Sequence, residues 1–558
     1  MDLKSRASNN IIERLGFLVA RKDQAGIAND LASGKDIEEV YGLGEAGLFD
    51  EFFYFLAELK ISDLFGWLDP NHTERSSNVK FPAVMLIYVM RIVAGLSFFW
   101  HIDSVILKSQ PLMRLIGFNA REIRKGTSRR GCNKNNQQQG DAVTEIEDPS
   151  GIRGPYCGDS IAAYIQAISA KALEKFFNKV ISILAANSFF PKQIQALLDA
   201  SEIQSTEKCV GRGSVTKEKP PKLRLRRKRI RKVMETVFGF KIWVVWDPTS
   251  KLPLAVRFTT IEVHDINMAR EIVQQAIANL AGSRSRIVSL AFDRGFLDGP
   301  FMWWLHTQGL RFYTPAKTSM TVYKDALSLI DSGIRQTRDT ARSVGHGKNK
   351  SMVTDHWDAV GVTGLTSAGF YSEKGSGSHE NRNDFVPNPI NAVVVLDDPF
   401  KKNNPTADTL IILTNAAVDT PLDAYDAYDW RSEIENSMFR EAKQAWFIER
   451  PAKNTADAFR AHAYLTIIVM ALTTAFQAWI IAQDKLERQG KQTGVRKFRE
   501  QVRLENSNKL IIFDEDRYAI FDTYEVFILC GKPVRKPRGE LESITKEDIL
   551  RKYDALLE

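Results

Sequence analysis

The sequence predicts a mixed α/β protein of several domains, with helices at its start and a sheet in its middle. The chain has 558 residues, which is too long for a single hydrophobic core. Apolar residues recur at helical spacing up to about residue 120. From residue 191 onward, short apolar runs alternate with amphipathic stretches, a pattern typical of strands and helices that share one sheet.

Changes in these patterns divide the chain into five segments. The polar stretch 125–151 contains almost no apolar residue and is expected to be a loop. We expect a helical N-terminal region in 1–190, the first part of an α/β domain in 191–317, a strand-rich insertion in 318–425, a helical end of the α/β domain in 426–483, and a charged C-terminal tail in 484–558. We assign no chemistry to the tail.

The α/β domain begins with QIQALLDASEI, a strand that carries Asp199. The segment VFGFKIWVVWDPTSKLPLAVRFTT predicts two strands around a turn at Asp247–Pro248. An amphipathic helix over INMAREIVQQAIANLA follows Asp265, which suits an N-cap. The strand RIVSLAF leads into Asp293, a helix covers DGPFMWWLHTQG, and LRFYTP is a further strand. This order predicts a ribonuclease-H-like domain, in which acidic residues at strand ends gather at one edge.

The remaining segments extend this domain. VVVLDDP and DTLIILTN predict strands in the insertion, and a helical segment over 429–449 holds Glu435. Residues 461–483 contain no Asp, Glu, Lys or Arg and are long enough to cross a bilayer, so a membrane protein is one alternative. His462, Gln477 and three threonines in that stretch favour a buried core helix, and we expect no membrane interaction.

Three carboxylates are the candidate catalytic and metal-binding residues. Asp199 and Asp293 each follow an apolar run, where a side chain leaves the buried sheet for its rim. A third carboxylate from a helix packed on the sheet, Glu435, completes a set that can hold two divalent ions about 4 Å apart. Oxygen ligands of this kind favour Mg²⁺, with Mn²⁺ as an alternative. Such a site activates water or a 3′-hydroxyl and stabilises the leaving 3′-oxygen at phosphorus.

Tyr428, Arg431 and Glu435 are three and four residues apart, so on one helix they share a face. A phenol and a guanidinium beside a carboxylate suit a phosphodiester, because two donors hold its oxygens while the carboxylate holds metal. The spacing therefore predicts that Tyr428 and Arg431 bind DNA. A surface ion pair between Arg431 and Glu435 is the alternative explanation.

A basic run is the second candidate for binding nucleic acid. Ten of the sixteen residues in 217–232 are Lys or Arg, and the run lies between the first strand and the hairpin. We expect it to contact the DNA backbone, an interaction that is salt-sensitive and carries no sequence information. A solvated loop is the alternative. The residues expected to bind DNA are Arg224, Arg226, Arg227, Lys228 and Arg229.

Three segments resemble the catalytic blocks of the IS4-like group of bacterial DDE transposases. LLDASEI resembles the first block, and AFDRGFLDG followed by FMWWLHTQGLRFYTPAK resembles the second. YDWRSEIENSMFREAKQAW resembles the third, in which a helix carries Tyr, Arg and the catalytic Glu, here Tyr428, Arg431 and Glu435. The resemblance covers about residues 195–480 and implies that Asp199, Asp293 and Glu435 are the catalytic triad.

One position departs from the third block. The motif has a Lys seven residues after the Glu, whereas here that position is Ala442 and Lys443 follows it. One extra residue turns a side chain by about 100° around a regular helix. Lys443 is the candidate for this DNA contact, with Arg440 or no contact as the alternatives.

The resemblance implies a transposase that cleaves DNA at element ends and joins the freed 3′-hydroxyl to target DNA. Its partner would be double-stranded DNA, both as terminal inverted repeats recognised by the N-terminal helices and as the target. A homodimer is expected in the DNA complex, because both ends must be held together. The alternatives are a DDE-derived nuclease without strand transfer and an inactive DNA-binding relic. With no secretory signal recognised and four scattered cysteines, we expect a cytoplasmic, nucleoid-associated protein.

Overall fold

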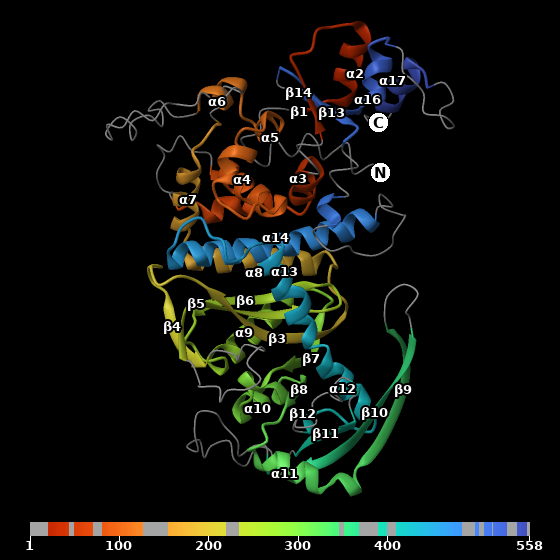
Figure 1. Cartoon of the computed structure of the whole chain (residues 1–558). Coiled ribbons are helices and arrows are strands. Elements are labelled where there is room, and N and C mark those ends of the chain that lie inside the picture. The colour runs from red at the N-terminus through yellow and green to blue at the C-terminus, as the bar shows by residue number, and fades with distance from the viewer. Residues whose placement is uncertain are drawn as a thin grey trace. The chain divides into compact units, whose positions relative to one another are not determined.

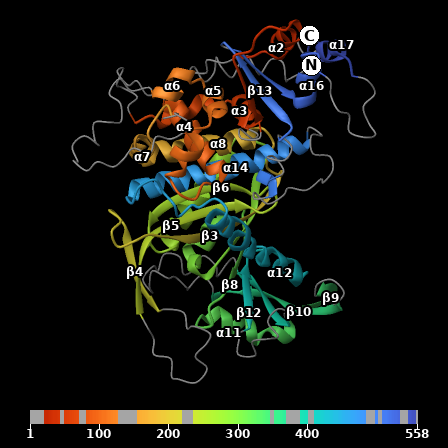
Figure 2. The ribbon, with the colours of Figure 1, turned by 45° about the horizontal axis from the view of Figure 1, so that its top comes forward.

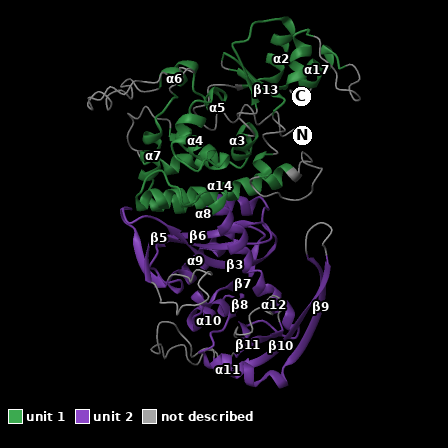
Figure 3. Cartoon of the chain, viewed as in Figure 1, with its two compact units in different colours: residues 1–177, 443–558 green, residues 178–442 purple. Residues whose placement is uncertain are grey.

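The computed structural model describes residues 21–43, 49–70, 81–126, 154–218, 234–344, 351–367, 389–397, 399, 409–482, 497–500, 507–515, 517–532 and 544–554. The chain divides into two compact units (Figure 3). Unit 1 is made of residues 1–177 and 443–558, and unit 2 of residues 178–442.

A ten-stranded mixed sheet forms the centre of unit 2. Its strands run in the order β4-β5-β3-β7-β8-β12-β11-β10-β9, and β6 also pairs with β5 (Figure 1). The strands are β3 (Gln193–Gln204), β4 (Gly213–Glu218), β5 (Met234–Asp247), β6 (Leu252–Thr260), β7 (Arg286–Phe292), β8 (Arg311–Pro315), β9 (Ile334–Val344), β10 (Ser351–Leu365), β11 (Ile390–Asp397) and β12 (Leu410–Thr414).

The first half of the sheet has the element order predicted from the sequence. β3 is antiparallel to β5 and parallel to β7, and β7 is parallel to β8. β5 and β6 form the predicted hairpin, whose turn is held by the buried Asp247 carboxylate as it accepts from the Thr249 and Ser250 amides. Helix α9 (Ile266–Leu280) lies between β6 and β7 in the chain, and α10 (Gly299–Thr307) between β7 and β8. This order is consistent with the ribonuclease-H-like arrangement.

The capping prediction for Asp265 is confirmed for its position but not for its hydrogen bond. Asp265 occupies the N-cap position of α9, but its side chain makes no capping hydrogen bond. Its carboxylate instead forms an ion pair with Lys241, with 3.0 Å between Nζ and Oδ1. A partly buried lysine on β5 therefore binds this carboxylate in place of the helix amides.

The strands of the insertion extend the sheet beyond β8. β11 and β12 are the strands expected at VVVLDDP and DTLIILTN, and β8, β12, β11, β10 and β9 are joined in sequence by antiparallel pairings. Helix α11 (Thr321–Ser328) contacts β10 and β11. Helix α12 (Pro421–Asp429) packs against the strands from β7 to β9 and is seen beside β10 and β12 in Figure 2.

The segment 429–449 is not one continuous helix, which corrects the prediction. Helix α12 ends at Asp429, and a turn follows at Trp430–Arg431. Residues Ile434–Phe439 (η10) are π-helical, and α13 (Arg440–Gln444) continues as an α-helix. A π-helical turn closes its hydrogen bonds one residue further along the chain than an α-helical turn, and such turns are frequent at functional sites.

Unit 1 contains the helices of the N-terminal region. They are α3 (Phe49–Glu58), η2 (Ser62–Leu68), α4 (Phe81–Ala94), η3 (Ile102–Ile106), α5 (Gln110–Leu115), α6 (Ala120–Lys125), α7 (Gly158–Ala167) and the start of α8 (Ala170–Ala186). The long helix α14 (Ala456–Ala482) packs against α4 and α7. Among the described residues, only its part Ala456–Ile480 is long and apolar enough to cross a membrane, and 78% of its most apolar window is buried.

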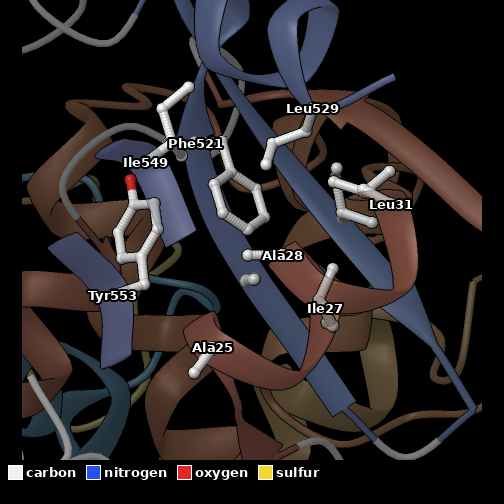
Figure 4. Close-up of a cluster of buried hydrophobic side chains, with 10 residues drawn as sticks. Ala25, Ile27, Ala28, Leu31, Phe521, Leu529, Ile549 and Tyr553 are labelled. Carbon is white, nitrogen blue, oxygen red and sulfur yellow. The ribbon is translucent and has the colours of Figure 1, made fainter. Parts of the chain in front are cut away.

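The charged tail expected for 484–558 is not confirmed. Its described residues form β13 (Lys509–Asp514), β14 (Arg517–Asp522), α16 (Thr523–Leu529) and α17 (Lys546–Asp554). Together with β1 (Arg21–Lys22), α2 (Gln24–Ser33) and β2 (Glu39–Gly42) they make a four-stranded sheet of order β1-β14-β13-β2 with helices beside it. Figure 4 shows their shared core, where Leu31 lies near Phe521 and Leu529. The two apolar runs in KLIIFDEDRYAIFD were the sequence signal for this hairpin.

Candidate active site

The pairing of β3 with β7 brings the first two candidate carboxylates together. These strands are parallel, and Leu198 is the register partner of Phe292. Asp199 and Asp293 are therefore the next residue on each of two adjacent strands that point the same way. Asp293 directly follows the end of β7, whereas β3 continues to Gln204, so Asp199 is a buried residue inside its strand rather than one at the rim of the sheet. The register nevertheless sets the two residues side by side.

Arg431 joins the third carboxylate to the first. Its Nη1 donates to Oδ2 of Asp199 at 3.1 Å and to Oε1 of Glu435 at 3.2 Å. The π-helical segment that carries Glu435 packs against β3. This packing brings Arg431, which lies 232 positions after Asp199 in the chain, into contact with Asp199. The side chains of Asp199, Arg431 and Glu435 are 9%, 16% and 57% exposed. The site therefore runs from a buried carboxylate to a solvent-facing one.

Asp199 is the group whose ionisation is most altered. Burial raises its pKa to about 7, and the negative charges of Glu435 and Asp293 act in the same direction. The Arg431 guanidinium and the Ala200 amide, which donates to Oδ1 at 2.8 Å, oppose that rise. Burial wins because a carboxylate loses more hydration at this edge than one cation and one amide restore.

Tyr428 and Asp293 belong to the same electrostatic group. Tyr428 lies in the last turn of α12, and burial raises its pKa. Asp293 raises that pKa further, while Arg431 opposes the rise. Burial alone would lower the pKa of Arg431, but Tyr428 and the three carboxylates outweigh it and raise that pKa. The phenol thus stays protonated and the guanidinium charged at neutral pH.

The donor chemistry of this edge fits divalent metal ions. Three carboxylates supply hard oxygen ligands, the kind that Mg²⁺ and Mn²⁺ prefer. Within the described residues, however, no group of three His, Cys, Asp or Glu side chains is arranged to hold a metal ion. The position of Arg431 explains this, because its guanidinium lies between Asp199 and Glu435 and compensates their charge. Arg431 occupies one oxygen of each carboxylate, Oδ2 of Asp199 and Oε1 of Glu435.

The other predicted residues are placed as follows. Lys443 is in α13, the first residue of unit 1 after its boundary, and its Nζ is 3.6 Å from Oε1 of Glu449. The five basic residues Arg224, Arg226, Arg227, Lys228 and Arg229 lie outside the described residues. Asp298, the other acid of the DRGFLDG run, caps α10 by accepting from the Phe301 amide at 3.0 Å. It is therefore a structural carboxylate.

Two features of the site were not recognised in the sequence. The first is the contact between Arg431 and Asp199, which has no local signal because it joins residues far apart in the chain. The second is the π-helical turn between Glu435 and Arg440. The sequence signal for this turn was the spacing of Lys443, which lies eight rather than seven residues after Glu435. A π turn accommodates one extra residue in a helix.

One family model matches the part of the chain that contains these residues. The family model described as the transposase DDE domain matches residues 192–472, and the chain belongs to this family. It is a DDE transposase, an enzyme of DNA cleavage and strand transfer, and enzymes of this family use divalent metal ions. No curated protein matches the sequence.

Among solved structures, the fold is similar to that in a cryo-EM structure of the piggyBac transposase synaptic complex with hairpin DNA. The identity is 9%, the alignment covers 87% of this chain and 80% of that chain, and the TM-score is 0.37.

Proposed function

We propose that the chain is a transposase of the IS4-like group in which Asp199, Asp293 and Glu435 hold two Mg²⁺ ions, with Mn²⁺ as an alternative. The bridge that Arg431 makes between Asp199 and Glu435 is the observation that carries this proposal. This bridge supports a site in which Glu435, from the third block, lies close to the strands that carry Asp199 and Asp293.

The residues around the carboxylates have distinct tasks in this proposal. Divalent ions bound there would activate the attacking oxygen and stabilise the leaving 3′-oxygen. Asp199 must be ionised to bind them, so the pKa of about 7 makes loading favourable toward higher pH. Arg431, once it releases a carboxylate, donates to the non-bridging oxygens of the phosphodiester. The protonated Tyr428 phenol is a second donor to the same group.

Lys443 is proposed as a further DNA contact on grounds of helical phase. In a regular α-helix, the extra residue between Glu435 and Lys443 would turn the lysine by about 100°. The π-helical turn Ile434–Phe439 accommodates one extra residue. After this turn, Lys443 faces the side of the helix that a residue seven positions after Glu435 would face in a regular α-helix. This supports Lys443 over Arg440 as the equivalent of the motif lysine.

The basic run is proposed to bind the DNA backbone. The run begins in β4, where its second residue, Glu218, is the register partner of Met234 in β5. The run therefore leaves and re-enters the sheet at neighbouring positions, and β5 is also the strand that pairs with β3. A cluster of Lys and Arg attached to the strand next to Asp199 suits the phosphates flanking the cut.

The remaining parts of the proposal concern the partners. Double-stranded DNA is bound as terminal inverted repeats, recognised by the N-terminal helices, and as target. Two copies of the chain act together in the DNA complex, because two ends must be joined. The protein is proposed to act in the cytoplasm, associated with the nucleoid.

The deciding experiment uses duplex DNA from the two flanks of the gene, incubated with the protein, Mg²⁺ and a supercoiled plasmid. Cleavage at the flanks together with products joined to the plasmid is the expected result. Cleavage without joined products would favour the nuclease alternative. Binding without metal-dependent cleavage would favour the DNA-binding relic.

A further inference from the structure

A rigid turn presents one guanidinium beside the carboxylate edge. The 3-10 turn Arg294–Phe296 follows Asp293, whose Oδ1 accepts from the Arg294 amide at 2.6 Å. Phe296 and Leu297 are buried beneath the turn, whereas the Arg294 side chain is exposed. The turn is thus anchored by its backbone and by its apolar residues, and its basic side chain is left at the surface.

The backbone of this turn packs closely against the residue that precedes α9. A Cβ built on Gly295 would lie 2.6 Å from Oδ2 of Asp265, so the turn approaches this carboxylate as closely as a glycine permits. Asp265 is itself held by Lys241 at 3.0 Å. After the turn, Asp298 fixes the start of α10. Arg294 therefore projects from a fixed point one residue after Asp293.

Arg294 differs from Arg431 in its partners. Arg431 is largely buried and engages two carboxylates. Within the part of the chain that the structure describes, the Arg294 guanidinium makes no hydrogen bond or ion pair. Its charge nevertheless reaches the site: burial raises the pKa of Tyr428, and Arg294 is one of the cations that oppose the rise. Arg294 is thus near the phenol and free to bind an anion.

We propose that Arg294 binds a phosphate of the DNA strand that is to be cut and positions that strand at the carboxylate edge. Three carboxylates repel a phosphodiester, and Arg431 compensates only part of their charge. A second guanidinium that the carboxylates do not engage offsets this repulsion where the strand enters. The planar fork of arginine suits two oxygens of one phosphate, which gives orientation as well as attraction. This inference rests on the proposed function.

The test compares Arg294→Ala and Arg294→Lys with Arg286→Ala. Arg286 is exposed at the opposite end of the same strand, β7, so its variant controls for loss of one surface charge. The substrate is duplex DNA from the flanks of the gene, in binding titrations over a range of salt concentrations and in Mg²⁺-dependent cleavage.

Arg294→Ala is expected to lose about five- to tenfold in DNA affinity and in kcat/KM. The slope of log affinity against log salt should fall by about 0.9, the value for one lost phosphate contact. The Mg²⁺ concentration for half-maximal cleavage should stay unchanged. Arg294→Lys should restore the salt slope, because it restores the charge, but only part of kcat/KM, because lysine lacks the planar fork. Arg286→Ala should behave as wild type.

Equal affinity and salt slope in Arg294→Ala and Arg286→Ala would overturn the inference, as would a salt slope that lysine does not restore. A shift in Mg²⁺ dependence would mean that Arg294 supports the metal ligands rather than the DNA. Absence of cleavage by the wild type would refute the proposed function, whereas the salt slopes would still decide the role of Arg294.

Discussion

The substitution Asp199→Asn tests both the burial of this carboxylate and its use. Burial raises the pKa of Asp199 from the ordinary 3.8 to about 7, and the residue is 7% exposed. Between these two pH values the Asp199 carboxyl is ionised in the unfolded chain but still protonated in the folded chain. Because the folded pKa is the higher one, the contribution of Asp199 to stability is fully present below pH 3.8 and is lost as pH rises through 7. About three pKa units correspond to about 4 kcal/mol.

An asparagine has no such ionisation cost. In EDTA, the variant should therefore gain stability relative to wild type by about 2 to 3 kcal/mol between pH 5 and pH 8. Hydrogen exchange of the β3 and β7 amides, corrected for intrinsic rates, measures the opening free energy of this part of the sheet. In Mg²⁺ the same variant should show no cleavage, because asparagine cannot supply the anionic ligand.

Asp298→Asn is the matched control, because the amide oxygen can still cap α10 and the carboxylate belongs to the same region. It should keep cleavage and the wild-type dependence of stability on pH. A stability difference between Asp199→Asn and wild type that is the same at pH 5 and pH 8 would refute the ionisation argument. Full cleavage by Asp199→Asn, or loss of cleavage only in Asp298→Asn, would refute the choice of metal ligand.

The remaining predictions address the other parts of the site. Glu435→Gln should abolish cleavage in the Mg²⁺ assay while leaving DNA affinity near wild type. The free energy of unfolding should change by less than about 1 kcal/mol, because the side chain is 57% exposed. Retained cleavage would contradict the role of Glu435. Arg431→Ala should reduce cleavage without abolishing it and should raise the pKa of Asp199 further, seen as a shift of the cleavage profile to higher pH; an unchanged profile would contradict the bridge. Neutralising the basic run should weaken binding to all duplexes alike and flatten the salt dependence, whereas a loss confined to the terminal repeat would identify it as a sequence-reading element. The substituted residues are Arg224, Arg226, Arg227, Lys228 and Arg229.

Local features of the sequence were sufficient to predict the elements that carry the site. Alternating and continuous apolar runs predicted β3, β5, β6, β7 and β8, because burial of one or both strand faces leaves a pattern in the residues themselves. Asp199 and Asp293 stood out for the same reason, as acids directly after such runs. The four-residue spacing of Arg431 and Glu435 also allowed an ion pair, the alternative to DNA binding, and the structure shows this contact at 3.2 Å.

Properties that depend on distant segments could not be predicted in this way. The hairpin KLIIFDEDRYAIFD has a local signal, but its pairing with residues near the start of the described chain has none. The π-helical turn left only a one-residue discrepancy in a motif.

The state of the carboxylate edge was decided by tertiary structure alone. The parallel register of β3 with β7 sets Asp199 beside Asp293. The packing of the π-helical segment on β3 sets Arg431 between Asp199 and Glu435. Desolvation and charge coupling arise from neighbours contributed by separate parts of the chain. For this reason the sequence by itself could identify the acids at this edge, whereas only the folded chain determines that one of them has a pKa of about 7 and is held by a guanidinium.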